Sequence, residues 1–178
     1  IYTLSLHDAL PILTSVLIVL ILIIILMVSR IQGTARVVNY AGLVRGKTQR
    51  IIKLEDAGMP QDEMIVDVDG YIEGLRFGSE ELDLVSLDDK AFLAKMEELD
   101  AYFDTLKQEI DLVRQVGYEN TNIIQKSETF FSLCDVATGL AETYAQRIAT
   151  RLGHFVALTI FYIVILIFMI LYDLFIDF

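Results

Sequence analysis

The sequence from Ala35 to Glu55, ARVVNYAGLVRGKTQRIIKLE, is basic, although the whole chain carries a net charge of −11 at pH 7. The basic residues that precede Glu55 are Arg30, Arg36, Arg45, Lys47, Arg50 and Lys53. Small and apolar residues recur in this stretch at spacings of four and three, the period of one helix face. They are Val37, Ala41, Val44, Thr48 and Ile51. The stretch therefore predicts a helix with one buried face.

A second, polar line runs beside this face and consists of Asn39, Gly42, Arg45 and Gln49. Gly42 and Gly46 each cost a helix about 1 kcal/mol relative to Ala. Their small-x-x-x-small spacing predicts the close approach of a second helix, which we expect to come from a second copy of the chain. A guanidinium at this contact needs an anionic complement. A small anion shared between two copies of Arg45 supplies it; the alternative is a purely structural arginine.

The pattern Asn39-x-Ala41-Gly42-x-x-Arg45-x-x-Thr48-x-Arg50 resembles the conserved box in the sensor domains of bacterial nitrate/nitrite sensor kinases. It is also similar to the N-terminal domain of type IV pilus chemotaxis transducers. The later SETFFSLCDVATGLAETYA, residues 127–145, resembles sensor regions that precede diguanylate cyclase or histidine kinase modules. The chain departs from the box at Gly46, where the family usually has a large apolar residue. This departure affects the expected ligand more than the expected fold.

The resemblance implies a homodimeric sensor of two-component or chemotaxis signalling that binds a small anion, for example nitrate, nitrite or another oxyanion. We expect Arg50 to act less directly than Arg45, through Glu55 or a lipid headgroup. The expected dimer contact is Gly42 and Gly46. Combined with the polar line, the resemblance gives the candidate ligand-binding residues Asn39, Gly42, Arg45, Gln49 and Arg50.

Two segments contain no charge, Leu13–Val28 and Phe155–Tyr172. With its flanks, the first reaches the roughly 20 residues needed to cross a bilayer. A cleaved signal peptide is the alternative, but its apolar region is usually shorter and precedes a small-residue cleavage site. We therefore expect transmembrane helices at residues 13–31 and 155–172, a helical sensor domain at 32–154 and a truncated tail at 173–178.

Residues 1–12 resemble the translation of a sequencing adaptor, so we expect them to be an artefact that carries no chemistry. The resemblance to receptors also implies an output domain that is missing from this fragment.

The charge bias alone gives an ambiguous orientation. Arg30, Arg36, Arg147 and Arg151 all flank the predicted spans on the side of the sensor domain, which by the positive-inside rule favours the cytoplasm. Long loops, however, translocate largely regardless of charge. Following the resemblance, we expect a two-pass protein of the bacterial cytoplasmic (inner) membrane with its bundle outside the cytoplasm. If the bundle is cytoplasmic, the basic stretch is expected to bind anionic membrane lipid.

Between the two apolar segments the sequence predicts four helices and no strand. Gly58–Pro60 ends the first helix, Ser86 or Asp88 caps the third, and Gly117 ends it. The second helix carries Met64, Ile65, Val68, Ile72 and Leu75. The third carries the heptad Phe92, Met96, Leu99, Phe103, Leu106, Ile110 and Val113. The fourth begins near Glu119 and carries Ile124, Phe131, Cys134, Ala141, Ala145, Ile148 and Leu152. This predicts an all-α, antiparallel up-down four-helix bundle continuous with two transmembrane helices.

Other chemistry finds little support in the sequence. Ala41–Thr48 fits the phosphate-binding loop pattern, but that loop requires a preceding strand. Asp67–Gly70 lacks the remaining ligands of a calcium loop. Cys134 and His154 have no partners at metal-ligand spacing. The acidic charge disfavours nucleic acid. We expect no enzyme activity, catalytic residues, metal or cofactor in this region.

The resemblance implies the function that we expect, the ligand-sensing module of a bacterial transmembrane receptor, namely a histidine kinase, a diguanylate cyclase or a chemotaxis transducer. The alternative is a structural two-span membrane protein whose coiled-coil domain only holds partners and binds no ligand.

Overall fold

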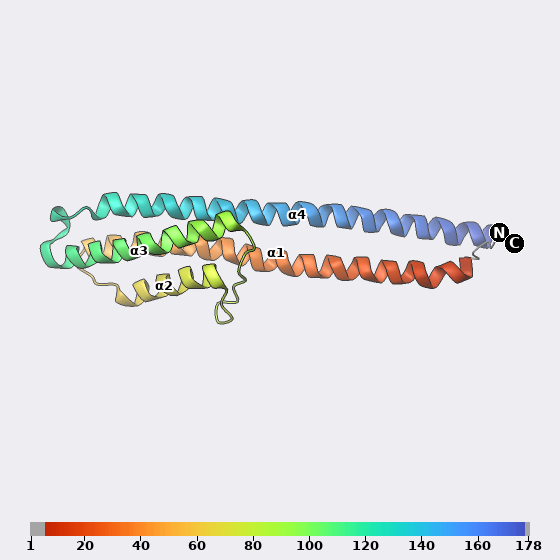
Figure 1. Ribbon diagram of the computed structural model, residues 1–178, viewed down its shortest axis with the longest axis horizontal. Coiled ribbons are helices and arrows are strands. Elements are labelled where there is room, and N and C mark those ends of the chain that lie inside the picture. The colour runs from red at the N-terminus through yellow and green to blue at the C-terminus, as the bar shows by residue number, and fades with distance from the viewer. Residues whose placement is uncertain (1–5, 177–178) are drawn as a thin grey trace. The chain divides into compact units, whose positions relative to one another are not determined.

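The computed structural model describes residues 6–176, which are entirely helical apart from their turns and connections (Figure 1). No strand occurs in this range, and the only β-type pairing there is an isolated bridge between Ser79 and Leu84. The helices are α1 (Leu6–Asp56), α2 (Asp62–Phe77), α3 (Lys90–Val116) and α4 (Ile123–Ile176), with a single 3-10 turn, η1 (Tyr118–Asn120), before α4. The all-α prediction is confirmed.

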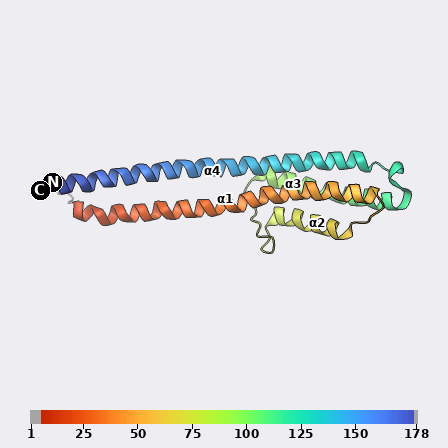
Figure 2. The ribbon, with the colours of Figure 1, turned by 180° about the vertical axis from the view of Figure 1, so that it is seen from behind.

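The four helices pack antiparallel, because residue numbers rise along one helix as they fall along its neighbour. The α1–α2 turn and the α3–α4 connection lie at the same end of the bundle in both views (Figures 1 and 2). Two contacts for each pair of neighbouring helices show this order. They are Tyr40–Tyr71 and Lys47–Asp67 for α1 and α2, Asp69–Lys107 and Arg76–Asp100 for α2 and α3, Phe103–Phe130 and Glu109–Lys126 for α3 and α4, and Arg45–Asp135 and Gln49–Ser127 for α1 and α4.

The predicted buried faces of α1 and α3 are confirmed. Every residue of the α1 line, Val37 to Ile51, is buried, and so is the complete α3 heptad from Phe92 to Val113. Burial of apolar side chains is the main stabilising contribution to such a bundle. The α3 heptad therefore serves the interior of this chain and is not available as a separate coiled-coil surface.

The predicted buried face of α4 is wrong over its first two turns. Ile123 and Phe130 are buried, whereas Ile124 is exposed and Phe131 is only partly buried. Both errors fall on pairs of adjacent apolar residues, where the period of 3.6 allows either member to face the core. Phe130 packs against Phe103 of α3, with ring centroids 5.4 Å apart, so Phe130 and not Phe131 faces the core.

Two helix boundaries also differ from prediction. The N-cap of α3 is Asp89, whose side chain accepts a hydrogen bond from the backbone N–H of Phe92 (3.0 Å), and not Ser86 or Asp88. The hydroxyl of Ser86 instead donates to the carbonyl of Arg76. α4 begins at Ile123 because η1 occupies the residues after Gly117.

The chain divides into two compact units, residues 32–145 and the pair of segments 1–31 and 146–178. The first unit is the four-helix bundle. In the second, the Tyr162 hydroxyl donates to the carbonyl of Leu13 (2.8 Å). Thr14, Ser15 and Thr159 donate to carbonyls one turn earlier in their own helices.

Both α1 and α4 contain a segment long and apolar enough to cross a bilayer. Each helix has a most apolar window of 18 residues. In α1 none of this window is buried inside the chain, and in α4 only 6% of it is. The core helix of a soluble protein would be mostly buried. By length, composition and exposure, the two segments are candidates for membrane spans.

Candidate functional site

The buried line of α1 directs the opposite side of that helix away from the bundle core. At 100° per residue, Asn39, Gly46 and Arg50 fall within about 40° of one another on this outward side. All three are exposed. Gly42 lies next to them, and a Cβ at Gly42 or Gly46 would meet no atom within 4 Å. Neither glycine is therefore required for packing within this chain.

Arg45 lies on the flank of α1 that contacts α4. Its guanidinium forms an ion pair with Asp135 and lies 5.3 Å from the ring centroid of Phe131. The pair is partly open to solvent, with side chains 38% and 48% exposed. One turn further along, the Gln49 amide donates to the hydroxyl of Ser127 (3.0 Å). Arg45 thus has an anionic complement within its own chain.

The candidate ligand residues therefore form two groups. Arg45 and Gln49 border the contact with α4, whereas Asn39, Gly42 and Arg50 belong to the outward side of α1. Arg50 forms no ion pair with Glu55, because that acid is buried and bound by Arg114. The structure thus gives one polar edge, between α1 and α4, next to a glycine-containing surface of α1.

Lys47, the remaining base of the box region, contacts the other neighbour of α1. Its ammonium binds the Asp67 carboxylate and the Tyr71 hydroxyl, both on α2. The hydrogen bond with Asp67 is the main cause of the raised pKa of Lys47. Ala41–Thr48 is helical throughout, so its backbone amides serve the helix and do not form a phosphate-binding loop.

Asp67–Gly70 is likewise part of α2 and not a calcium loop. Asp69 binds Lys107 of α3 (2.8 Å). Within the described residues no group of three or more His, Cys, Asp and Glu side chains is placed to hold a metal ion.

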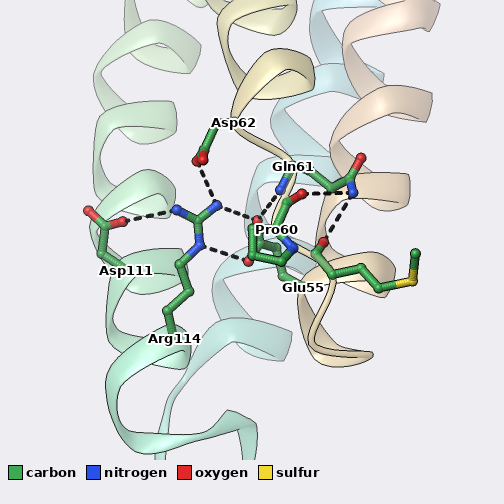
Figure 3. Close-up of polar contacts among 7 residues, drawn as sticks. Glu55, Pro60, Gln61, Asp62, Asp111 and Arg114 are labelled. Atoms are coloured by element: carbon green, nitrogen blue, oxygen red, sulfur yellow. Dashed lines mark hydrogen bonds and ion pairs between the residues drawn. The ribbon is translucent and has the colours of Figure 1, made fainter.

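The most buried ion pair joins Glu55 at the end of α1 to Arg114 of α3 (Figure 3). Their side chains are 2% and 28% exposed. Arg114 donates to both carboxylate oxygens, from Nε to Oε2 (2.9 Å) and from an Nη atom to Oε1 (2.6 Å). The backbone N–H of Gln61 donates to Oε1 as well (2.8 Å). The pair thus ties the end of α1 and the start of α2 to α3.

Two further acids, Asp62 and Asp111, lie against the same guanidinium (Figure 3). The hydrogen bond with Glu55 is the main cause of the raised pKa of Arg114. The sequence prediction missed this cluster. One signal was present: Glu55 lies four residues after Ile51, so it continues the buried line of α1, and an acid in that position needs a basic partner.

A second buried acid stabilises the start of α4. Glu109 of α3 accepts a hydrogen bond from the backbone N–H of Asn122 (2.6 Å) and binds the ammonium of Lys126. The hydrogen bond from Lys126 is the main cause of the lowered pKa of Glu109. A carboxylate is favoured here because helix N-termini carry free N–H groups and partial positive charge.

Cys134 faces the core of the bundle, as predicted. Burial raises the pKa of its thiol to about 12, so the thiolate is not populated at neutral pH. The cysteine therefore fits a core residue and not a nucleophile.

Comparison with protein-family models, curated proteins and solved structures gives no match.

Proposed function

We propose that this chain is the ligand-sensing module of a bacterial transmembrane receptor, with two membrane spans and its bundle outside the cytoplasm. One observation carries the proposal: α1 and α4 each run without interruption from an apolar segment into the bundle. A helix without a break transmits a shift or rotation along its axis, and such small displacements are a common form of signalling. The resemblance of the Asn39–Arg50 box to bacterial sensor domains supports the same function.

The ligand site in this proposal lies where the outward sides of two α1 helices meet. Gly42 and Gly46 leave open space on this side, which is what close approach of a second helix requires. Membrane insertion would hold two copies parallel, so that equivalent residues face one another at the same height. Each copy then brings Arg50 to the contact and Arg45 to its edge beside α4, and this concentration of positive charge favours an anion.

Asp135 has a defined part in this mechanism. In the absence of ligand, its carboxylate is the complement of Arg45. A small oxyanion at the dimer contact competes with Asp135 for the guanidinium, which favours planar, bidentate acceptors. Binding would therefore loosen the α1–α4 contact as it strengthens the contact between subunits. This exchange of partners supplies the helix displacement.

The test is a thermal-shift screen of the full chain in lipid nanodiscs against nitrate, nitrite, other oxyanions and small carboxylates. A ligand at 100 times its Kd adds about 2.7 kcal/mol of stability by mass action. Arg45→Ala should abolish this gain, and Arg45→Lys should bind weakly because it lacks the bidentate fork. Asp135→Asn should bind severalfold more tightly, because a competing carboxylate is removed.

The Arg45–Asp135 pair also supports the rival function, a structural two-span protein in which this arginine only holds α1 against α4. In that case Arg45→Ala and Asp135→Asn should destabilise the bundle by similar amounts, and no anion in the screen should stabilise the wild type. A ligand that stabilises Arg45→Ala as fully as the wild type would show that the site lies elsewhere.

A further inference from the structure

A groove of about 470 Å³ lies along α2 and the connection that follows it. Two glycines on one side of α2 explain its shape. At Gly74 a Cβ would lie 3.1 Å from Leu84 and 3.2 Å from Leu82, so the connection packs directly against the helix there. At Gly70, one turn earlier, a Cβ would meet nothing within 4 Å. The groove is therefore open over Gly70 and narrowed by the connection at Gly74, and its lining continues to Phe77 and Leu82.

The wall formed by the connection is held in place. Ser79 and Leu84 exchange two backbone hydrogen bonds (2.9 and 2.8 Å). Gly78 adopts a φ of +85°, which a residue with a side chain adopts only with strain. Asp83 is bound by Arg36 of α1. The groove is thus a feature of the folded bundle and its walls are ordered before any ligand arrives.

The lining combines apolar and acidic groups. Val66 and Phe77 are each 68% exposed, a high value for apolar side chains. Glu73 and Glu81 are also exposed, and within residues 6–176 neither side chain forms a hydrogen bond or an ion pair. The third acid of the lining, Asp67, is already bound by Lys47.

No lysine or arginine belongs to the lining among the described residues. Two bases lie near its aromatic rings, and both have acidic partners. Lys47 lies over Tyr71 and is bound to Asp67, and Arg76 lies over Phe77 and is bound to Asp100. The unsatisfied charge of the groove is therefore negative.

We propose that this groove binds a small organic cation, an amine or ammonium compound with an apolar body. Glu73 and Glu81 would bind the cationic group, and Phe77 and Val66 would cover the apolar part. The volume falls within the range of about 300–1,000 Å³ that is usual for small-molecule sites. This site is separate from the proposed anion site and does not depend on it.

The probe is 2-phenylethylamine, compared with its neutral analogue 2-phenylethanol and the anion phenylacetate. Calorimetric titration of the full chain in phosphatidylcholine nanodiscs, with empty nanodiscs subtracted, gives each Kd. The amine should bind at least roughly tenfold more tightly than either analogue, because only the amine forms charge-assisted hydrogen bonds. Glu73→Gln combined with Glu81→Gln should remove that difference, whereas Glu97→Gln on α3 should leave it unchanged.

Gly70 offers a matched pair of variants. Gly70→Leu should abolish binding by filling the groove, whereas Gly70→Ala should change the Kd less than about threefold. Both substitutions raise helix propensity, so neither is expected to unfold α2. Arg45→Ala should leave amine binding intact, which separates this site from the anion site.

Three results would overturn the proposal. The first is that the amine binds no more tightly than 2-phenylethanol, or does not bind above the empty-nanodisc background. The second is that Gly70→Leu binds as well as Gly70→Ala. The third is that a Lys-Phe-Lys tripeptide binds more than tenfold more tightly than the amine, which would make the groove a peptide site.

Discussion

Replacing Glu55 with Ala should be one of the most damaging single changes in the bundle. The carboxylate accepts hydrogen bonds from Nε and Nη of Arg114 and from the backbone N–H of Gln61. Removing one partner of a buried ion pair typically costs about 3–5 kcal/mol. Arg114 is 28% exposed and keeps Asp62 and Asp111 as neighbours, so we expect the lower end, about 3 kcal/mol.

For a unit of this size, a loss of about 3 kcal/mol lowers Tm by about 10 °C. Circular dichroism of the full chain in nanodiscs during heating measures this shift. Glu55→Gln should lose about half as much, because an amide oxygen still accepts from Gln61 and from one N–H of Arg114. Glu63→Gln is the matched control: Glu63 is exposed in the first turn of α2, and its loss should stay below about 0.5 kcal/mol.

A double-mutant cycle with Arg114→Ala isolates the interaction between the two side chains. The Glu55 and Arg114 losses should be strongly non-additive, since either variant alone already breaks the pair. If Glu55→Ala is no more destabilising than Glu63→Gln, the pair does not hold α1 and α2 to α3, and the account of this end of the bundle is wrong.

Three further predictions concern Glu109, Phe130 and Gly46. The lowered pKa of Glu109 contributes stability that is present above its ordinary value of 4.5 and is lost as pH falls through the folded-state pKa. The difference in Tm between the wild type and Glu109→Gln should therefore shrink as the pH falls below 4.5. A difference that stays the same at every pH would contradict this prediction. Phe130→Ala should cost about 3–5 kcal/mol in denaturant unfolding and Phe131→Ala clearly less; equal losses would contradict the core register of α4. Gly46→Leu should reduce dimerisation measured by sedimentation, whereas Gly139→Leu should not, although a Cβ meets nothing within 4 Å at either position; an unchanged dimer would place the subunit contact elsewhere.

The sequence predicted most accurately the buried face that a long, unbroken heptad defines. On α3 the seven positions from Phe92 to Val113 keep the spacing of four and three throughout, so one face is defined although Leu93, Tyr102 and Leu112 adjoin it. On α4, Ile123–Ile124 and Phe130–Phe131 are apolar pairs, and local spacing does not decide which member is buried. Phe130 is the buried member because it packs against Phe103 of α3. The helical period of α4 carries no information about that contact.

The candidate site shows a similar limit. The position of Gly42, Gly46 and Arg50 on the outward side of α1 follows from the helical period alone. The partner of Arg45 does not, because Asp135 lies 90 residues away on α4. The Glu55–Arg114 pair, 59 residues apart, was hidden for the same reason. Long-range ion pairs depend on how the helices are arranged. The only feature of the local sequence that points to such a pair is an acid on a buried helix face, as at Glu55.

The central claim, a two-pass receptor with its bundle outside the cytoplasm, is tested most directly by cysteine labelling on intact cells. Single cysteines at Glu81 and Asp100, both in the bundle unit, are treated with a membrane-impermeant maleimide. Native Cys134 is buried and its thiol pKa is about 12, so it contributes little background. The account predicts that both positions are labelled without permeabilisation. Labelling only after permeabilisation would place the bundle in the cytoplasm and contradict the proposed function.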